Sequence, residues 1–204
     1  PNKASKEYEE CDRLSKLTDG STAYNNELES MYTKVTADEV AKKYADQYNA
    51  AKKVVDTLKS SDKWGVDSTL DDVKKRRDEL KNKIDNNSDY NKYKHAKTDA
   101  DGNDVYEYDT DKMKEENATL YAEYVADTKN LESYNSMIVD YEKNQKIMED
   151  TEKYVTKADS GEAVADASNT KVVEEVNNTN TDSKAKAKTL LDNKISAAKA
   201  YVAE

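Results

Sequence analysis

The sequence predicts a mainly all-α protein, an elongated antiparallel helical bundle or coiled coil, with one small β-hairpin inserted near residues 90–109. Three observations predict this class. Four glycines and one proline in 204 residues leave few places where helices would break. Apolar residues recur at spacings of three and four along most of the chain. Charged residues make up 37% and hydrophobic residues 35%, which suits narrow apolar seams better than a thick core. We therefore expect a single elongated helical domain over residues 1–204.

The boundaries of the expected helices follow from capping residues and from the phase of the apolar series. Thr36 and Glu39 have the spacing of a capping box, and the apolar rhythm changes phase at this point, so one helix should end and another begin here. The segment around Trp64 is a predicted connection, and Ser68 or Thr69 should cap the helix that follows it. Helices are expected at about 4–18, 21–35, 37–60, 69–85, 110–157 and 182–203, with a loop at 160–181. The alternative for this loop is a short helix or strand within it, at Val172–Val176.

The longest expected helix, at 110–157, carries a heptad seam over about six repeats, which is typical of a coiled coil. Three polar residues on this seam would weaken it while fixing its register. The seam runs through Met113, Asn117, Leu120, Tyr124, Asp127, Leu131, Tyr134, Ile138, Tyr141, Gln145, Met148, Glu152 and Val155.

Residues 90–109 depart from the helical spacing. Aromatic and basic residues recur at every second position before a tip rich in Asp, Gly and Asn, and two tyrosines do so after it. This alternation around a turn predicts a β-hairpin. Because an isolated hairpin is marginal in water, this one should pack against the helices or against a partner. Tyr93, Tyr106 and Tyr108 are therefore the candidate partner-binding residues.

The tip of this hairpin holds the one weak candidate for a metal site, formed by Asp99, Asp101, Asn103 and Asp104. A calcium loop of the EF-hand type that began at Asp99 would need glycine at its sixth position and glutamate at its twelfth. The chain has Asp104 and Thr110 there. A solvated turn is the preferred interpretation, and calcium binding is the alternative.

No catalytic or cofactor site is expected. Cys11 and His95 are the only cysteine and the only histidine, so a His–His or Cys₂His₂ metal site within one chain is excluded. A nucleophilic Cys11–His95 pair is formally possible, but a helix-seam cysteine and a surface histidine are the simpler interpretation. The four glycines stand singly, and none lies in a phosphate-binding motif.

Charge and hydropathy limit the partners. The net charge is −10, and arginine occurs only at Arg13, Arg76 and Arg77, so nucleic acid and anionic membrane surfaces are not expected partners. No run approaches the roughly 18 apolar residues of a membrane span, so no membrane insertion is expected within this segment. A single cysteine suits both cytosolic proteins and many exported bacterial proteins.

The composition resembles that of helical exported bacterial proteins, such as needle-tip and surface coiled-coil proteins, although no motif identifies one family. We expect a non-enzymatic structural or interaction protein, extracellular or at the cell surface. It would bind a protein partner or self-associate in a surface, secretion or filament assembly. The alternative is a cytoplasmic helical scaffold or chaperone-like adaptor. A helical-bundle ligand carrier or enzyme is the least favoured hypothesis.

Overall fold

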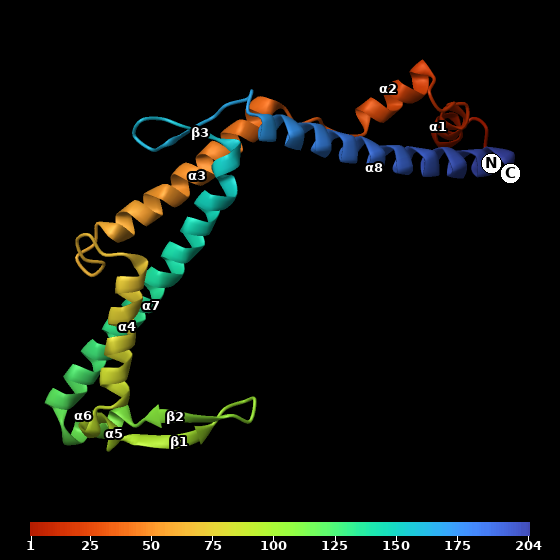
Figure 1. The fold of residues 1–204 in the computed structure, drawn as a ribbon. Helices are drawn as coiled ribbons and strands as arrows, with labels where there is room; N and C mark the ends of the chain where they lie inside the picture. The colour runs from red at the N-terminus through yellow and green to blue at the C-terminus, as the bar shows by residue number, and fades with distance from the viewer. The chain divides into compact units, whose positions relative to one another are not determined.

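The computed structural model describes residues 1–204 and confirms a mainly all-α protein, which is 69% helical and contains eight α-helices (Figure 1). The helices are α1 Lys6–Ser15, α2 Thr22–Ser30, α3 Ala37–Lys59, α4 Leu70–Asp85, α5 Ser88–Asn91, α6 Thr110–Glu116, α7 Ala118–Thr151 and α8 Thr170–Ala203. A short 3₁₀ turn, η1, spans Glu152–Tyr154. The strands are β1 Lys94–Thr98, β2 Asp104–Tyr108, β3 Thr156–Lys157 and β4 Ala163–Val164, and they form two antiparallel hairpins, β1–β2 and β3–β4.

The contacts within the chain group it into two compact units. Unit 1 combines Pro1–Tyr48 with Thr151–Glu204, and unit 2 is the continuous segment Asn49–Asp150. The chain therefore leaves unit 1 within α3 and returns to it at the end of α7. The single domain expected from the sequence stays a prediction.

In unit 1, helix α8 packs against α1 and α2. Leu191 and Ile195 of α8 are buried against Tyr24 of α2 in one apolar cluster. The hydroxyl of Tyr24 donates a hydrogen bond to the carboxylate of Asp192 at 2.6 Å and accepts one from the ammonium of Lys188 at 2.9 Å. The apolar cluster and the two hydrogen bonds of Tyr24 together hold α2 against α8.

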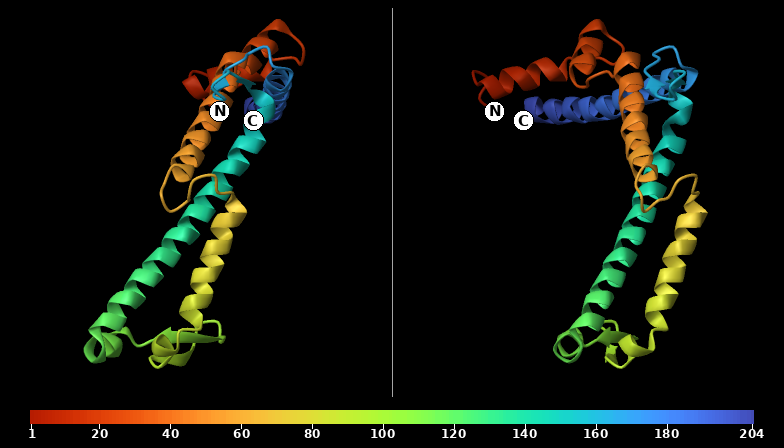
Figure 2. Two further views of the ribbon diagram at one scale, coloured as in Figure 1. Left: turned by 60° about the vertical axis from the view of Figure 1, so that its left-hand side comes forward. Right: turned by 90° about the vertical axis from the view of Figure 1, so that its left-hand side faces the viewer.

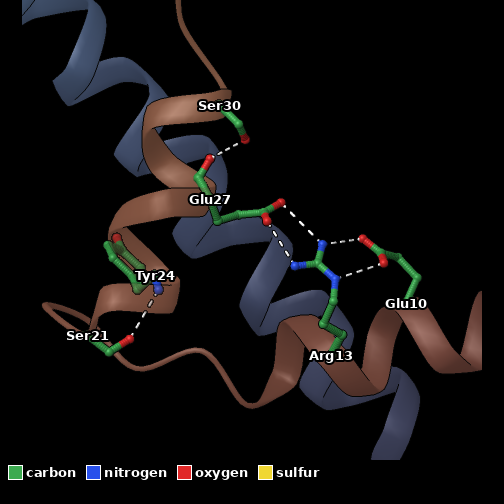
Figure 3. A network of polar contacts seen from close by, with 6 residues as sticks. All are labelled: Glu10, Arg13, Ser21, Tyr24, Glu27 and Ser30. Carbon is green, nitrogen blue, oxygen red and sulfur yellow. Dashed lines mark hydrogen bonds and ion pairs between the residues drawn. The ribbon is translucent and has the colours of Figure 1, made fainter.

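A network of polar contacts joins α1 to α2 beside this cluster (Figure 3). The guanidinium of Arg13 donates to the carboxylate of Glu10 on its own helix at 2.6 Å and to that of Glu27 on α2 at 2.9 Å. At the start of α2, the hydroxyl of Ser21 accepts the backbone N–H of Tyr24 at 3.1 Å. The charged side chains are partly exposed, so water screens the ion pairs and they contribute modestly to stability.

The break predicted near Thr36 is present, but α2 ends at Ser30 and not near residue 35. The side chain of Asn180 on α8 binds the backbone of Val35, so Val35 lies outside the helix. Its amide oxygen accepts the N–H of Val35 at 2.9 Å, and its NH₂ group donates to the carbonyl of Val35 at 3.0 Å. These bonds take the place of helical ones. The capping box of Thr36 and Glu39 then starts α3, as the sequence predicted.

The prediction of a loop at 160–181 followed by a helix from 182 is wrong. Strand β4 lies near the start of this stretch and pairs with β3, which precedes it, and α8 already begins at Thr170. The side chain of Asn169 caps α8 by accepting the N–H groups of Lys171 and Val172. Val172 is fully buried against α3, where it packs with Val40 and Ala41. Tertiary burial therefore holds a helix of Asn- and Thr-rich sequence that has little intrinsic preference for it.

The single helix predicted at 110–157 is also wrong, because Asn117 divides it into α6 and α7. The backbone of Asn117 is not helical, with φ −150° and ψ 85°, and its amide oxygen accepts the N–H of Leu120 at 3.0 Å. An asparagine that caps α7 cannot also be helical. The helix then ends at Thr151, where the chain enters η1 and β3.

In unit 2, α4 lies alongside α7 (Figures 1 and 2). One apolar cluster joins Trp64, Val73 and Ile138, and a second joins Ile84 and Met113 with their neighbours. The apolar and aromatic residues of the predicted seam from Met113 to Tyr141 lie in these clusters. Met113 and Ile138 are buried, whereas Asn117 is exposed because it serves as a cap. No helix of the chain is both long enough and apolar enough to cross a bilayer.

Candidate partner-binding hairpin

The β-hairpin predicted near residues 90–109 is present. Strands β1 and β2 pair antiparallel from Lys94 opposite Tyr108 to Thr98 opposite Asp104. At the tip, the carboxylate of Asp99 accepts the N–H groups of two residues further along the turn, at 3.0 and 2.8 Å. Aspartate stabilises tight turns in this way.

The base of the hairpin is fixed by a cluster of aromatic rings in unit 2. Tyr108 of β2 lies against Tyr124 of α7, with ring centroids 5.1 Å apart. Tyr124 also meets Tyr90 of α5 edge to face at 5.2 Å. Met113 of α6 is fully buried in the same cluster. Burial raises the pKa of Tyr108 and of Tyr124. The hairpin is therefore anchored at its base by this packed cluster of Tyr90, Tyr108, Met113 and Tyr124, which we call the platform.

Tyr93 completes this base. Its hydroxyl donates to the carboxylate of Glu116 on α6 at 2.9 Å, and this bond raises the pKa of Tyr93. Its carbonyl accepts the N–H of Asp109 at 2.8 Å and so closes the hairpin where the chain enters α6. Tyr93 and Tyr108 are thus half-buried residues that position the hairpin.

Beyond the base, both strands are exposed. Tyr106 is 68% exposed and Val105 is 38% exposed. The ammonium of Lys94 lies 4.2 Å from the centroid of the Tyr106 ring and covers part of it. Among the three candidate tyrosines, only Tyr106 is therefore largely exposed. Sequence reasoning did not single out Val105, although a valine beside an exposed tyrosine in a strand is a usable signal.

The four residues of the weak calcium candidate lie together at the tip. The carboxylate of Asp99 is engaged by backbone N–H groups, so it serves the turn. No group of three or more His, Cys, Asp or Glu side chains in the chain is arranged to hold a metal ion. No metal is assigned to this site.

An open groove of about 720 Å³ lies between α4 and α7 in unit 2. Four of its charged side chains, Lys63, Arg76, Lys83 and Asp127, contact other groups of the protein. The guanidinium of Arg76 donates to the carbonyl of Trp64 at 2.6 Å, and the ammonium of Lys83 lies 3.5 Å from the carboxylate of Asp127. Its residues are Asp62, Lys63, Arg76, Glu79, Leu80, Lys83, Asp127, Asn130 and Tyr134.

Cys11 and His95 belong to different units. Cys11 is a free thiol, partly buried in an open groove beside Leu14 and Tyr201. The Nε2 atom of His95 lies 3.5 Å from the carboxylate of Glu107 across the hairpin.

Tyr90 gives the platform a pH dependence. Its side chain is 1% exposed, and its hydroxyl donates to the carboxylate of Asp127 at 2.9 Å. Burial and this hydrogen bond raise the pKa of Tyr90 above its ordinary value of 10.0. A raised pKa means that the folded state holds the phenol proton more tightly. The contribution of Tyr90 is therefore complete below about pH 10 and is lost as the pH rises further.

We expect Tyr90→Phe to lower the free energy of unfolding by about 1 kcal/mol at neutral pH, because the hydrogen bond is lost. The variant should also lose less stability than the wild type when the pH is raised above about 10. Melting temperatures across this range measure both effects, with Tyr106→Phe as a control on an exposed ring. An alkaline loss as steep in Tyr90→Phe as in the wild type would contradict the assignment.

The fold and this site define a mainly α-helical protein that carries an exposed β-hairpin on a packed aromatic base. Comparison of the chain with protein-family models, with curated proteins and with solved structures finds no match.

Proposed function

We propose that this chain is a non-enzymatic interaction protein that binds a protein partner through the β1–β2 hairpin. One observation carries the proposal: Tyr106 and Val105 are exposed on an element whose base is fixed in the apolar platform. Tyrosine offers a partner a large apolar ring and a polar tip, and it is enriched at protein interfaces. An ordered hairpin loses little conformational entropy on binding, which favours affinity.

Folding alone gives little reason for an aromatic residue at position 106. The ring of Tyr108, two residues further on the same face of β2, packs on Tyr124 and thereby stabilises the hairpin. The ring of Tyr106 is 68% exposed and buries little apolar surface. A binding role accounts for this difference between two tyrosines of one strand.

We further propose that the protein works outside the cell or at its surface, as part of a surface, secretion or filament assembly. The support is compositional: an acidic, strongly hydrophilic helical chain with one cysteine. A cytoplasmic scaffold or adaptor is the second candidate. Fractionation of the source cells, with the full-length protein detected by antibody, distinguishes the two locations.

Site-specific photo-crosslinking tests the binding role. A photoreactive phenylalanine analogue at position 106 should crosslink to one discrete protein in the source cells. The matched control is the same analogue at Val139, which is 63% exposed on α7. The proposal predicts a specific adduct at position 106 and none at position 139. Equal labelling at both positions, or labelling at 139 alone, would contradict it.

The crosslinked partner can then be purified and its affinity measured. We expect the double variant Val105→Ser/Tyr106→Ser to weaken binding by about tenfold or more, because exposed apolar anchors dominate interface energies. Its melting temperature should match that of the wild type, since neither side chain is buried in the core. Val139→Ser is the matched control. An unchanged affinity in the double variant would rule out the hairpin as the contact.

A further inference from the structure

The β1–β2 hairpin has two open edges, because its sheet contains only two strands. Two backbone hydrogen bonds fix which groups point outward: Asp99 N–H to the carbonyl of Asn103 at 2.9 Å, and Asp109 N–H to that of Tyr93 at 2.8 Å. Antiparallel pairs alternate between bonded and non-bonded positions. The pair of Ala96 with Tyr106 is therefore non-bonded. The N–H and C=O groups of Ala96 and Tyr106 accordingly face the open edges.

The two edges carry opposite charges. Strand β1 contains Lys94, His95 and Lys97 and no carboxylate, whereas β2 contains Asp104 and Glu107 and no basic residue. Lysines on an edge strand oppose the addition of further strands, so the β1 edge is protected.

The β2 edge differs in having an apolar centre. Val105 and Tyr106, both of high β-propensity, lie between the carboxylates of Asp104 and Glu107. Both apolar side chains are exposed, at 38% and 68%. Glu107 lies 3.5 Å from the ammonium of Lys97 and remains half-exposed. The outward backbone groups, the apolar centre and the flanking acids lie on one edge.

We propose that the β2 edge binds an extended segment of the partner as a third strand of the sheet. The segment carries the pattern basic–apolar–apolar–basic. Backbone hydrogen bonds to Tyr106 provide affinity, and the side chains opposite β2 provide specificity. The two basic residues lie opposite Asp104 and Glu107, and the apolar pair lies opposite Val105 and Tyr106. This inference rests on the proposed function and names the chemistry of the partner.

A second copy of the chain fits this edge less well. In the β1 strand of a second copy, the residues at even positions have outward-facing backbone groups. If that strand paired antiparallel with β2 in the register of the hairpin, Thr98 would lie opposite Asp104, and Ala96 opposite Tyr106. Asp104 then faces no basic residue. A partner segment with lysine or arginine at that position satisfies it.

Two labelled peptides test the charge pattern on the intact chain. One has the core lysine–valine–valine–lysine and the other glutamate–valine–valine–glutamate, within the same flanking sequence. Fluorescence anisotropy at low salt should show the basic peptide binding at least about tenfold more tightly than the acidic one. Equal binding, or tighter binding of the acidic peptide, would overturn the assignment.

Proline substitutions test the edge, since proline removes one N–H group. Tyr106→Pro deletes an outward N–H without removing a bond between β1 and β2, and Tyr106→Ala separates the loss of the ring from the loss of the N–H. Ala96→Pro is the matched control on the opposite edge. We expect Tyr106→Pro to bind the basic peptide at least about tenfold more weakly than Tyr106→Ala, and Ala96→Pro to stay within about twofold of the wild type. If only Ala96→Pro lost binding, the peptide would bind the β1 edge, and the assignment to the β2 edge would be wrong.

The outcomes separate this inference from the proposed function. A specific crosslink at position 106 without binding of the basic peptide overturns the inference and leaves the proposed function in place. Self-association in sedimentation velocity that Tyr106→Pro abolishes, again without peptide binding, identifies a second copy as the occupant and also overturns it. Absence of both the crosslink and the peptide complex overturns both.

Discussion

Replacing Trp64 with alanine should lower the free energy of unfolding by about 3–5 kcal/mol, the usual cost of removing a large buried aromatic side chain. Trp64 is 1% exposed, and its ring lies 4.8 Å from that of Tyr141 on α7. Its indole N–H donates to the carbonyl of Ser68 at 2.9 Å. The guanidinium of Arg76 donates a hydrogen bond to the backbone carbonyl of Trp64 at 2.6 Å. The substitution therefore leaves a cavity between α4 and α7 and removes the hydrogen bond that shapes the loop before α4.

Val66→Ala is the matched control in the same loop. Val66 is 92% exposed, so its truncation should change the free energy of unfolding by less than about 0.5 kcal/mol. Denaturant unfolding followed by far-UV circular dichroism measures both variants. Similar effects at the two positions would show that Trp64 does not anchor the loop.

Val172→Asp should destabilise unit 1 by about 3–5 kcal/mol. Val172 is fully buried against Val40 and Ala41 of α3. The change removes the apolar contact and places an unpaired carboxylate where water does not reach, which is costly unless the group becomes protonated. We expect a lower melting temperature and a loss of helix in the circular dichroism spectrum.

The adjacent residue supplies the control for this prediction. Val173 is 41% exposed, so Val173→Asp should alter the free energy of unfolding by no more than about 0.5 kcal/mol. The contrast between adjacent valines also tests the position of α8, because helical geometry alone places one inward and its neighbour outward. Equal tolerance of aspartate at both positions would mean that residues 170–181 do not form the helix seen in the structure.

The hairpin shows how much of the candidate site could be predicted from the sequence. The alternation of tyrosines around an Asp/Gly/Asn tip was enough to predict the two strands and their turn. The same alternation gave no means of distinguishing Tyr93, Tyr106 and Tyr108 from one another. Only the packing of Tyr108 on Tyr124 distinguishes the residues of the base from the exposed ring of Tyr106. Residues 124 and 108 are adjacent only in the folded chain, so periodicity carried no information about that contact.

The sequence by itself determined the helical class, the capping box that begins α3, a cap at Ser68 or Thr69 before α4, and the β1–β2 hairpin, because each depends on residues within a few positions of one another. Tertiary structure decided the rest. Asn180 binds the backbone of Val35 and keeps it out of a helix, and the burial of Val172 against α3 makes a helix of a stretch rich in asparagine and threonine. Helix propensity in such a stretch is weak, and burial against a distant helix overrides it.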